Sequence, residues 1–266
     1  MKLPAGLLCT GIVLAFLGPI GVVAQQSAET LYELSSDYSG HVFDPGHNAI
    51  YLTLTGRRAL VRLNLTNGEE TAALPLSLFP SAMTMTPNRQ WLFIGEGSTT
   101  ELPGKIAEID LTTGTLSREL DLPFTPHGLT ATDAKLLVVS SLSADGQGPE
   151  VRLFDTASGA ISARTVTTTY GPHTLDPSQL SIFAYGLGNR FSPVVRGFFD
   201  RTELRFTSLR TSRYGGEDGR VMVGTVVAFP DGSLLINGDK VYRGAPNDAA
   251  TDMLFLKALE GHVGGS

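Results

Sequence analysis

The sequence predicts an all-β protein, a β-propeller built from four-stranded antiparallel blades. One unit recurs at intervals of 45 to 46 residues: Pro126 follows Pro80 by 46 positions (126 − 80), and Gly159 follows Gly114 by 45 (159 − 114). Each unit holds several short apolar segments separated by turn residues, and this period is typical of propeller blades. The chain of 266 residues is long enough for one such domain.

About five repeats are legible within one domain, from residue 25 to residue 266. We expect them at residues 39–79, 80–125, 126–171, 172–219 and 220–266. Propellers typically have four to eight blades. Either five blades close the ring, or the chain carries part of a larger ring. A short strand at residues 30–34 is expected to complete a blade from the other end of the domain.

The third and fourth strands of each blade are expected to be joined by a hairpin turn. Asn64, Asp110 and Asp155 hold equivalent positions, each four residues before a glycine. Such a side chain accepts hydrogen bonds from backbone N–H groups two or three residues later, and the glycine supplies a positive φ. In the fourth repeat Asp200 is followed by Leu204 where the glycine is expected, so that turn has diverged.

Residues 1–24 are predicted to be a signal peptide. Lys2 provides a charged start, an apolar stretch follows, and the Val-Val-Ala sequence at 22–24 resembles a cleavage site. The alternative is an uncleaved anchor, because the apolar stretch approaches the length that spans a bilayer. We expect a secreted or periplasmic protein with no membrane association after cleavage.

Composition excludes several classes of function. The formal net charge is −6 and no cluster of lysine and arginine occurs, which disfavours nucleic acid as a partner. The single cysteine, Cys9, lies in the predicted signal peptide, so the mature chain would lack disulfides and cysteine-based catalysis or metal binding. Motifs of serine hydrolases, zinc proteases and P-loop enzymes are absent. We therefore predict no cofactor, and the sequence favours a protein that is not an enzyme.

One end of the blades is the expected place for a binding site. In a four-stranded meander, the loop that leads into the innermost strand and the loop between the second and third strands lie at the same end. This end, called the channel face below, collects Ser81, His127 and His173. The two imidazoles could bind a metal or transfer protons. The alternative is that each Pro-His pair only forms a turn, and no third ligand has a matching register.

Longer loops add further candidates for ligand binding to the channel face. Asp145 lies in a glycine-rich loop that suggests calcium, but the spaced carboxylates of a calcium loop are missing. Asn189 and Arg190 lie in another long loop. Long loops on a rigid scaffold are where binding residues concentrate.

The repeat also resembles a known family. The order Pro-His-Gly, inner strand, Asp-Pro or Asp-Gly turn, apolar strand and Asp-x-x-x-Gly hairpin is similar to the YVTN-type β-propeller repeat. Residues 106–110, Ile-Ala-Glu-Ile-Asp, approximate the Val-x-Val-Ile-Asp strand of that repeat. The resemblance covers residues 39–200 well and residues 224–242 loosely. It implies kinship with lactonase-like propellers and with propellers like the β-chain of quinoprotein amine dehydrogenase.

Three hypotheses of function follow from these observations. The first is an exported binding or interaction module, with a protein or small-molecule ligand at the channel face. The second is a lactonase-like hydrolase of a small ester or lactone. The third is a propeller subunit that supports a redox partner. The absence of a converging set of carboxylates and histidines favours the first hypothesis.

Overall fold

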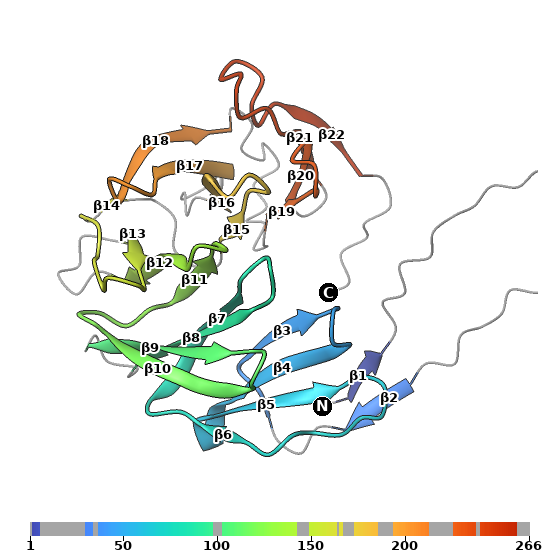
Figure 1. The fold of residues 1–266 in the computed structure, drawn as a ribbon. Helices are drawn as coiled ribbons and strands as arrows, with labels where there is room; N and C mark the ends of the chain where they lie inside the picture. The colour runs from blue at the N-terminus through green and yellow to red at the C-terminus, as the bar shows by residue number, and fades with distance from the viewer. Residues whose placement is uncertain are drawn as a thin grey trace, which may run out of the picture.

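The structure is a computed structural model that describes residues 2–5, 30–33, 37–97, 103–142, 149–163, 165–166, 173–185, 194–212, 226–237 and 240–259. These residues form five four-stranded sheets, in each of which four consecutive strands pair antiparallel (Figure 1). A single turn of 3-10 helix covers Thr55–Arg57. The predicted all-β propeller of four-stranded blades is confirmed.

Each sheet is a meander, named here as a blade in chain order from blade 1 to blade 5. Blade 1 consists of β3 (Gly40–Asp44), β4 (Ala49–Leu54), β5 (Ala59–Asn64) and β6 (Leu74–Pro75). Blade 2 consists of β7 (Phe79–Met85), β8 (Trp91–Gly97), β9 (Gly104–Asp110) and β10 (Thr115–Leu122). Blade 3 consists of β11 (Gly128–Ala131), β12 (Leu136–Leu142), β13 (Pro149–Asp155) and β14 (Thr165–Val166).

The remaining blades follow the same order. Blade 4 consists of β15 (Thr174–Leu175), β16 (Ser181–Tyr185), β17 (Val194–Asp200) and β18 (Arg205–Thr211). Blade 5 consists of β19 (Val227–Ala228), β20 (Leu234–Asn237), β21 (Lys240–Arg243) and β22 (Phe255–Ala258). Within the described ranges, no helix has the length and apolar character that crossing a bilayer requires.

The blades stand side by side around an open arc. The first strand of each blade contacts the first strand of the next, from β3 through β7, β11 and β15 to β19, so these are the inner strands. In Figure 1 blade 1 and blade 5 lie at the two ends of the arc, and the ring is not closed. The early strand is present as β2 (Thr30–Glu33), but it pairs with β1 (Lys2–Ala5). The expectation that it completes a blade is therefore wrong, because blade 5 draws its outer strand from residues 255–258.

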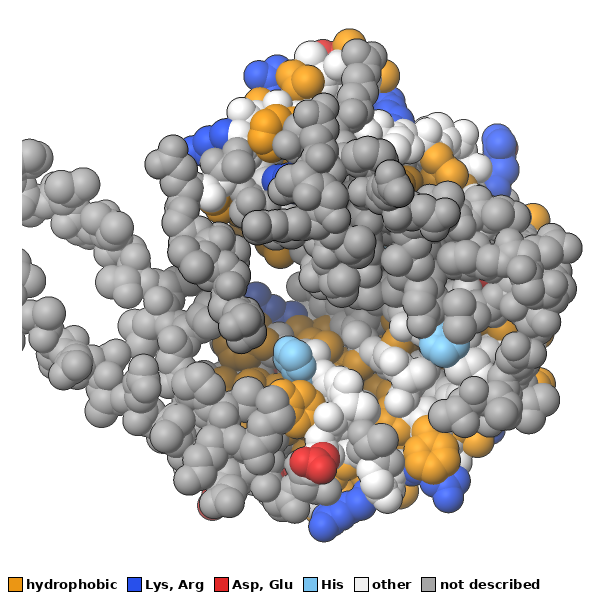
Figure 2. Space-filling model, turned by 180° about the vertical axis from the view of Figure 1, so that it is seen from behind, with side chains coloured by type: hydrophobic (Ala, Val, Ile, Leu, Met, Phe, Trp, Pro, Cys, Tyr) orange, Lys and Arg blue, Asp and Glu red, His pale blue; other side chains and the backbone are white. Residues whose placement is uncertain are grey.

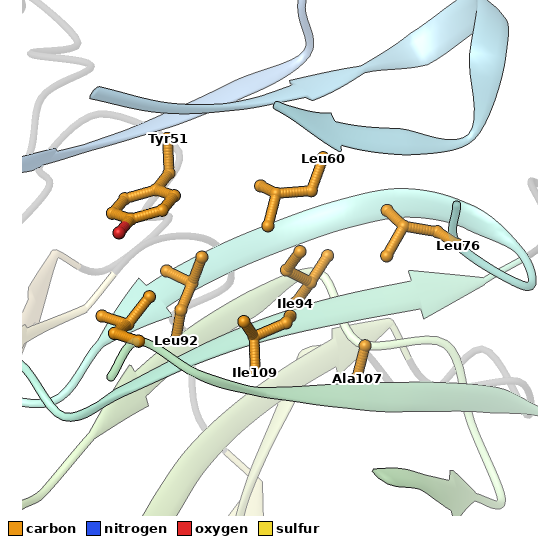
Figure 3. Close-up of a cluster of buried hydrophobic side chains, with 8 residues drawn as sticks. Tyr51, Leu60, Leu76, Leu92, Ile94, Ala107 and Ile109 are labelled. Atoms are coloured by element: carbon orange, nitrogen blue, oxygen red, sulfur yellow. The ribbon is translucent and has the colours of Figure 1, made fainter. Parts of the chain in front are cut away.

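The core lies between the blades. Because successive side chains of a strand point to opposite faces, each central strand contributes to two layers of packing. In β8, Leu92 and Ile94 pack toward blade 1 with Tyr51 and Leu60, as Figure 3 shows. Phe93, between them in sequence, packs toward blade 3. Each such buried side chain contributes roughly 1.5–3 kcal/mol of transfer free energy.

The hairpin turns have the predicted chemistry. The Oδ1 atoms of Asn64, Asp110 and Asp155 accept hydrogen bonds from backbone N–H groups two residues later, at 2.8, 2.7 and 3.0 Å. The glycines that end these turns have φ of 76°, 71° and 74°. Leu204 holds the same left-handed conformation with φ of 47°, which costs a residue that has a Cβ atom about 1–2 kcal/mol. Its side chain packs against the core between blades 3 and 4, a contact that glycine could not make.

Polar contacts also join the blades. The guanidinium of Arg196, in β17 of blade 4, is fully buried. It donates to Asp252 Oδ1 of blade 5 at 2.9 Å, to Ser181 Oγ at 2.9 Å, and to the Asp176 carboxylate. It also lies 4.6 Å from the ring centroid of Phe183. Two carboxylates, a hydroxyl and an aromatic face therefore surround one cation at the interface of blades 4 and 5.

Candidate functional site

The channel face is organised by hydrogen bonds between neighbouring inner strands. Ser81, in β7, lies within hydrogen-bonding distance of the Pro126 carbonyl at the start of blade 3. Thr130 Oγ1, in β11, donates to the carbonyl of His173 at the start of blade 4, at 2.9 Å. Thr174 donates in the same way to the carbonyl of Val226 at the start of blade 5. The structure therefore places Ser81, His127 and His173 at the starts of three successive inner strands.

Ser81 has a structural task in this arrangement. Its Oγ lies 3.0 Å from the carbonyl oxygen of Gly95 as well as near that of Pro126. A hydroxyl has one proton to donate, so it serves one carbonyl at a time. The residue as a whole is exposed. Its hydroxyl joins blades 2 and 3, and a ligand that used the same proton would compete with that contact.

His127 is the more accessible of the two candidate histidines. Its backbone N–H donates to the carbonyl of Ser140 at 2.8 Å, which fixes its position beside β12. The residue is half-buried, and burial lowers the pKa of His127 below the ordinary value of 6.5. A neutral imidazole can accept a hydrogen bond or a metal at one ring nitrogen. Such a group suits recognition of a polar ligand at neutral pH.

His173 is almost completely enclosed. Only 8% of the residue is exposed, and neither ring nitrogen has a hydrogen-bond partner among the residues that the structure describes. Burial lowers the pKa of His173 to about 4, so the ring is neutral at pH 7. An enclosed neutral imidazole with unused nitrogens is costly for the fold, and the surrounding packing has to compensate for it.

The two histidines do not form a metal centre with other side chains. In the described part of the chain, no group of three or more His, Cys, Asp or Glu side chains converges. Each imidazole could supply one ligand, but the four ligands of a structural zinc site are not brought together there. The predicted candidates Asp145, Asn189 and Arg190 lie outside the described residues, and their role stays a prediction.

Sequence reasoning missed two buried carboxylates near the channel face. Glu96, at the end of β8, is fully buried. Its Oε2 atom accepts a hydrogen bond from the backbone N–H of Leu78 at 2.6 Å, while Oε1 has no hydrogen-bond partner among the described residues. Burial raises the pKa of Glu96 above its ordinary value. Glu150 accepts from Ser141 Oγ at 3.0 Å and from Arg152 Nε at 3.2 Å. The sequence signal that could have identified them is a glutamate next to an apolar strand segment, after it for Glu96 and before it for Glu150.

Replacement of His173 tests its enclosed neutral state. The pKa in the folded state, about 4, is below the unfolded value of 6.5, so the unfolded chain binds the proton more readily. The contribution to stability is complete above pH 6.5 and is lost as pH falls toward 4, by up to about 3 kcal/mol. In urea unfolding experiments, the free energy of unfolding of the His173→Leu variant should fall by less than that of the wild type as pH is lowered from 6.5 to 4.

The matched control is His41→Leu, at an exposed histidine on the inner strand of blade 1. This variant should keep the pH dependence of the wild type. Equal slopes of unfolding free energy against pH for His173→Leu and the wild type would show that His173 does not titrate as an enclosed group.

Comparisons with known proteins support the fold and nothing finer. Neither a family model nor a curated protein matches the sequence. Among solved structures, the chain is similar to a functionally unknown protein from Desulfotomaculum acetoxidans, with a TM-score of 0.64 and 15% identity over 85% of this chain and 71% of that one. The chain is therefore a β-propeller protein, and its membership in the YVTN-type family stays a prediction.

Two further structures show the same fold. The Swd1 (Cps50) β-propeller domain of Myceliophteria thermophila has a TM-score of 0.58 and 11% identity over 87% of this chain and 75% of that one. Hydrazine synthase of Kuenenia stuttgartiensis has a TM-score of 0.56 and 15% identity over 82% of this chain. This chain spans 58% of the length of the hydrazine synthase chain.

Proposed function

We propose that this protein is an exported β-propeller that binds a protein or small-molecule ligand at the channel face. The observation that carries the proposal is the alignment of three successive inner-strand starts, with Ser81, His127 and His173, by hydrogen bonds between blades. A ligand at this end of the arc would contact several blades at once. A rigid scaffold that presents neighbouring loops is the usual setting for a binding site.

The character of the surface supports a ligand that is not strongly charged. Seen from behind in Figure 2, the described part of the molecule shows histidine side chains among hydrophobic and uncharged ones, with lysine and arginine mostly along the outline. The two candidate histidines are favoured in their neutral form, because burial lowers the pKa of each. Uncharged groups at a partly apolar surface favour ligands that offer hydrogen bonds and apolar contact.

Capture from the culture medium of the host tests the proposal. The immobilised chain would be compared with a His127→Glu variant, which places a charge on the channel face, and with Thr202→Glu. Thr202 lies in the exposed hairpin turn of blade 4, at the opposite end of the strands. We expect the same proteins or metabolites to be retained by the wild type and Thr202→Glu and lost by His127→Glu. Identical retention by all three would place the binding surface elsewhere.

The same preparations address export and hydrolysis. A first residue at Gln25 in protein recovered from the medium or the periplasm would support the predicted cleavage. Turnover of simple lactones or esters that is lost in His127→Ala would favour the hydrolase hypothesis over the binding module.

A further inference from the structure

A second surface, at the opposite end of the blades, has the make-up of a small-molecule site. A groove of about 440 Å³ lies between blades 1 and 2. It is bounded by the turn after β3, by β4 and β5, and by the hairpin turn that follows β9. Small-molecule sites occupy roughly 300–1,000 Å³ and combine apolar walls with a few polar groups.

The walls of the groove are apolar and rigid. Leu60 of blade 1 and Ile109 and Leu111 of blade 2 line it, and all three belong to the buried core between these blades. Tyr51 lines it as well, and Figure 3 shows the tyrosine in the same buried cluster as Leu60 and Leu92. The apolar walls are therefore held in place by packing that exists without a ligand.

A cation without an anionic partner lies in the same groove. Arg62 Nη2 donates to the backbone carbonyl of His47 at 3.4 Å, and its guanidinium is also a hydrogen-bond partner of the Tyr51 hydroxyl. Both partners are uncharged. Arg62 takes part in none of the ion pairs found among the described residues. Its positive charge is therefore open to an anion, and a guanidinium matches a carboxylate in two parallel hydrogen bonds.

The nearest carboxylate is already occupied. Asp44 is fully buried, and its Oδ2 lies 2.6 Å from His47 Nδ1 while Oδ1 accepts from the N–H of Gly46 at 3.0 Å. Burial alone would raise the pKa of Asp44, but His47 and the backbone donors hold it below its ordinary value. The carboxylate is thus ionised and turned toward His47, whose ring lines the groove. Asp44 does not neutralise Arg62.

Tyr51 adds a neutral donor beside the guanidinium. Burial is the main cause that raises the pKa of Tyr51, so the hydroxyl keeps its proton at neutral pH. We propose that this groove binds a small organic acid, with its apolar body against Leu60, Ile109 and Leu111 and its carboxylate on Arg62 and the Tyr51 hydroxyl. This site is separate from the channel face and does not depend on the function proposed there.

Binding of 4-phenylbutyrate, compared with the neutral 4-phenylbutanamide, tests the charge requirement. The two probes share the apolar body and differ in the charged group. Isothermal titration of the purified chain should show the acid binding at least about tenfold more tightly than the amide, the effect of one charge-assisted contact. Methyl signals of Leu60 and Ile109 should shift with the acid, while those of the core between blades 4 and 5 should not.

Two substitutions connect that preference to the groove. Arg62→Gln should abolish the preference for the acid. Thr112→Asp should weaken binding of the acid by at least about tenfold, because it adds a negative charge at an exposed turn residue that lines the groove. Arg205→Gln, at an exposed arginine of blade 4, is the control and should bind as the wild type does. Equal binding of acid and amide, no binding of either, or a preference that survives in Arg62→Gln would overturn the proposal.

Discussion

Replacement of Arg196 by methionine is expected to lower the free energy of unfolding by about 3–5 kcal/mol, the usual cost of removing one partner from a buried ion pair. Methionine fills much of the same space but leaves the Asp176 carboxylate without its cation and Asp252 paired only with Arg210. Both carboxylates are nearly inaccessible to water, so water cannot replace the guanidinium. Urea unfolding of the purified variant and the wild type measures the difference.

The physical cause is tested by a rescue. Adding Asp176→Asn to Arg196→Met removes the unpaired charge of Asp176, while Asp252 keeps its ion pair with Arg210, and should restore part of the lost stability. Arg205→Met is the control, because its ion pair with Glu203 is exposed and should change stability by less than about 1 kcal/mol. A loss of stability as small as that of the control would mean that the network contributes little at the interface of blades 4 and 5.

Replacement of Phe93 by alanine is the second change with a large expected effect, a loss of about 3–5 kcal/mol. The ring is fully buried and packs with Leu137, Val139 and Phe154 of the neighbouring blade. Alanine would leave a cavity between two sheets whose backbones are held by their own hydrogen-bond ladders, so the site cannot easily collapse. The midpoint of urea unfolding should fall.

The slope of that transition carries separate information. In a repeat architecture each blade contacts only its neighbours, so a weakened interface between blades 2 and 3 could divide unfolding into two steps. Leu180→Ala is the matched control, since the side chain of Leu180 is 53% exposed and should change stability by less than about 0.5 kcal/mol. An unchanged midpoint for Phe93→Ala would contradict the view that the core between the blades stabilises the arc.

The candidate site was predictable only in part. The period of 45 to 46 residues placed Ser81, His127 and His173 at the same end of successive blades, because equivalent positions of a repeat share a face. Their contacts were not predictable, since they depend on the distance between inner strands. The hydroxyl of Ser81 reaches a carbonyl of the next blade. His173 is enclosed, whereas His127, its equivalent in the repeat, is only half-buried.

The groove between blades 1 and 2 could not be read from sequence at all. Arg62 and Tyr51 are strand residues with no motif around them, and Leu111 is 49 positions from Arg62 (111 − 62). They line one groove because the second sheet packs against a face of the first. The same holds for Arg196 and Asp252, which are 56 residues apart and meet at an interface between blades.

The repeat, the strands and the hairpin turns follow from the amino-acid sequence without knowledge of the packing. These are local properties: alternation of apolar side chains, an Asn or Asp that caps the turn, and a glycine that accepts a positive φ. Tertiary structure alone decided which polar groups are buried, which charges are paired and how the blades are placed around an open arc. Burial and pairing depend on contacts between residues far apart in the chain, and only the packing of one sheet on the next brings those residues together.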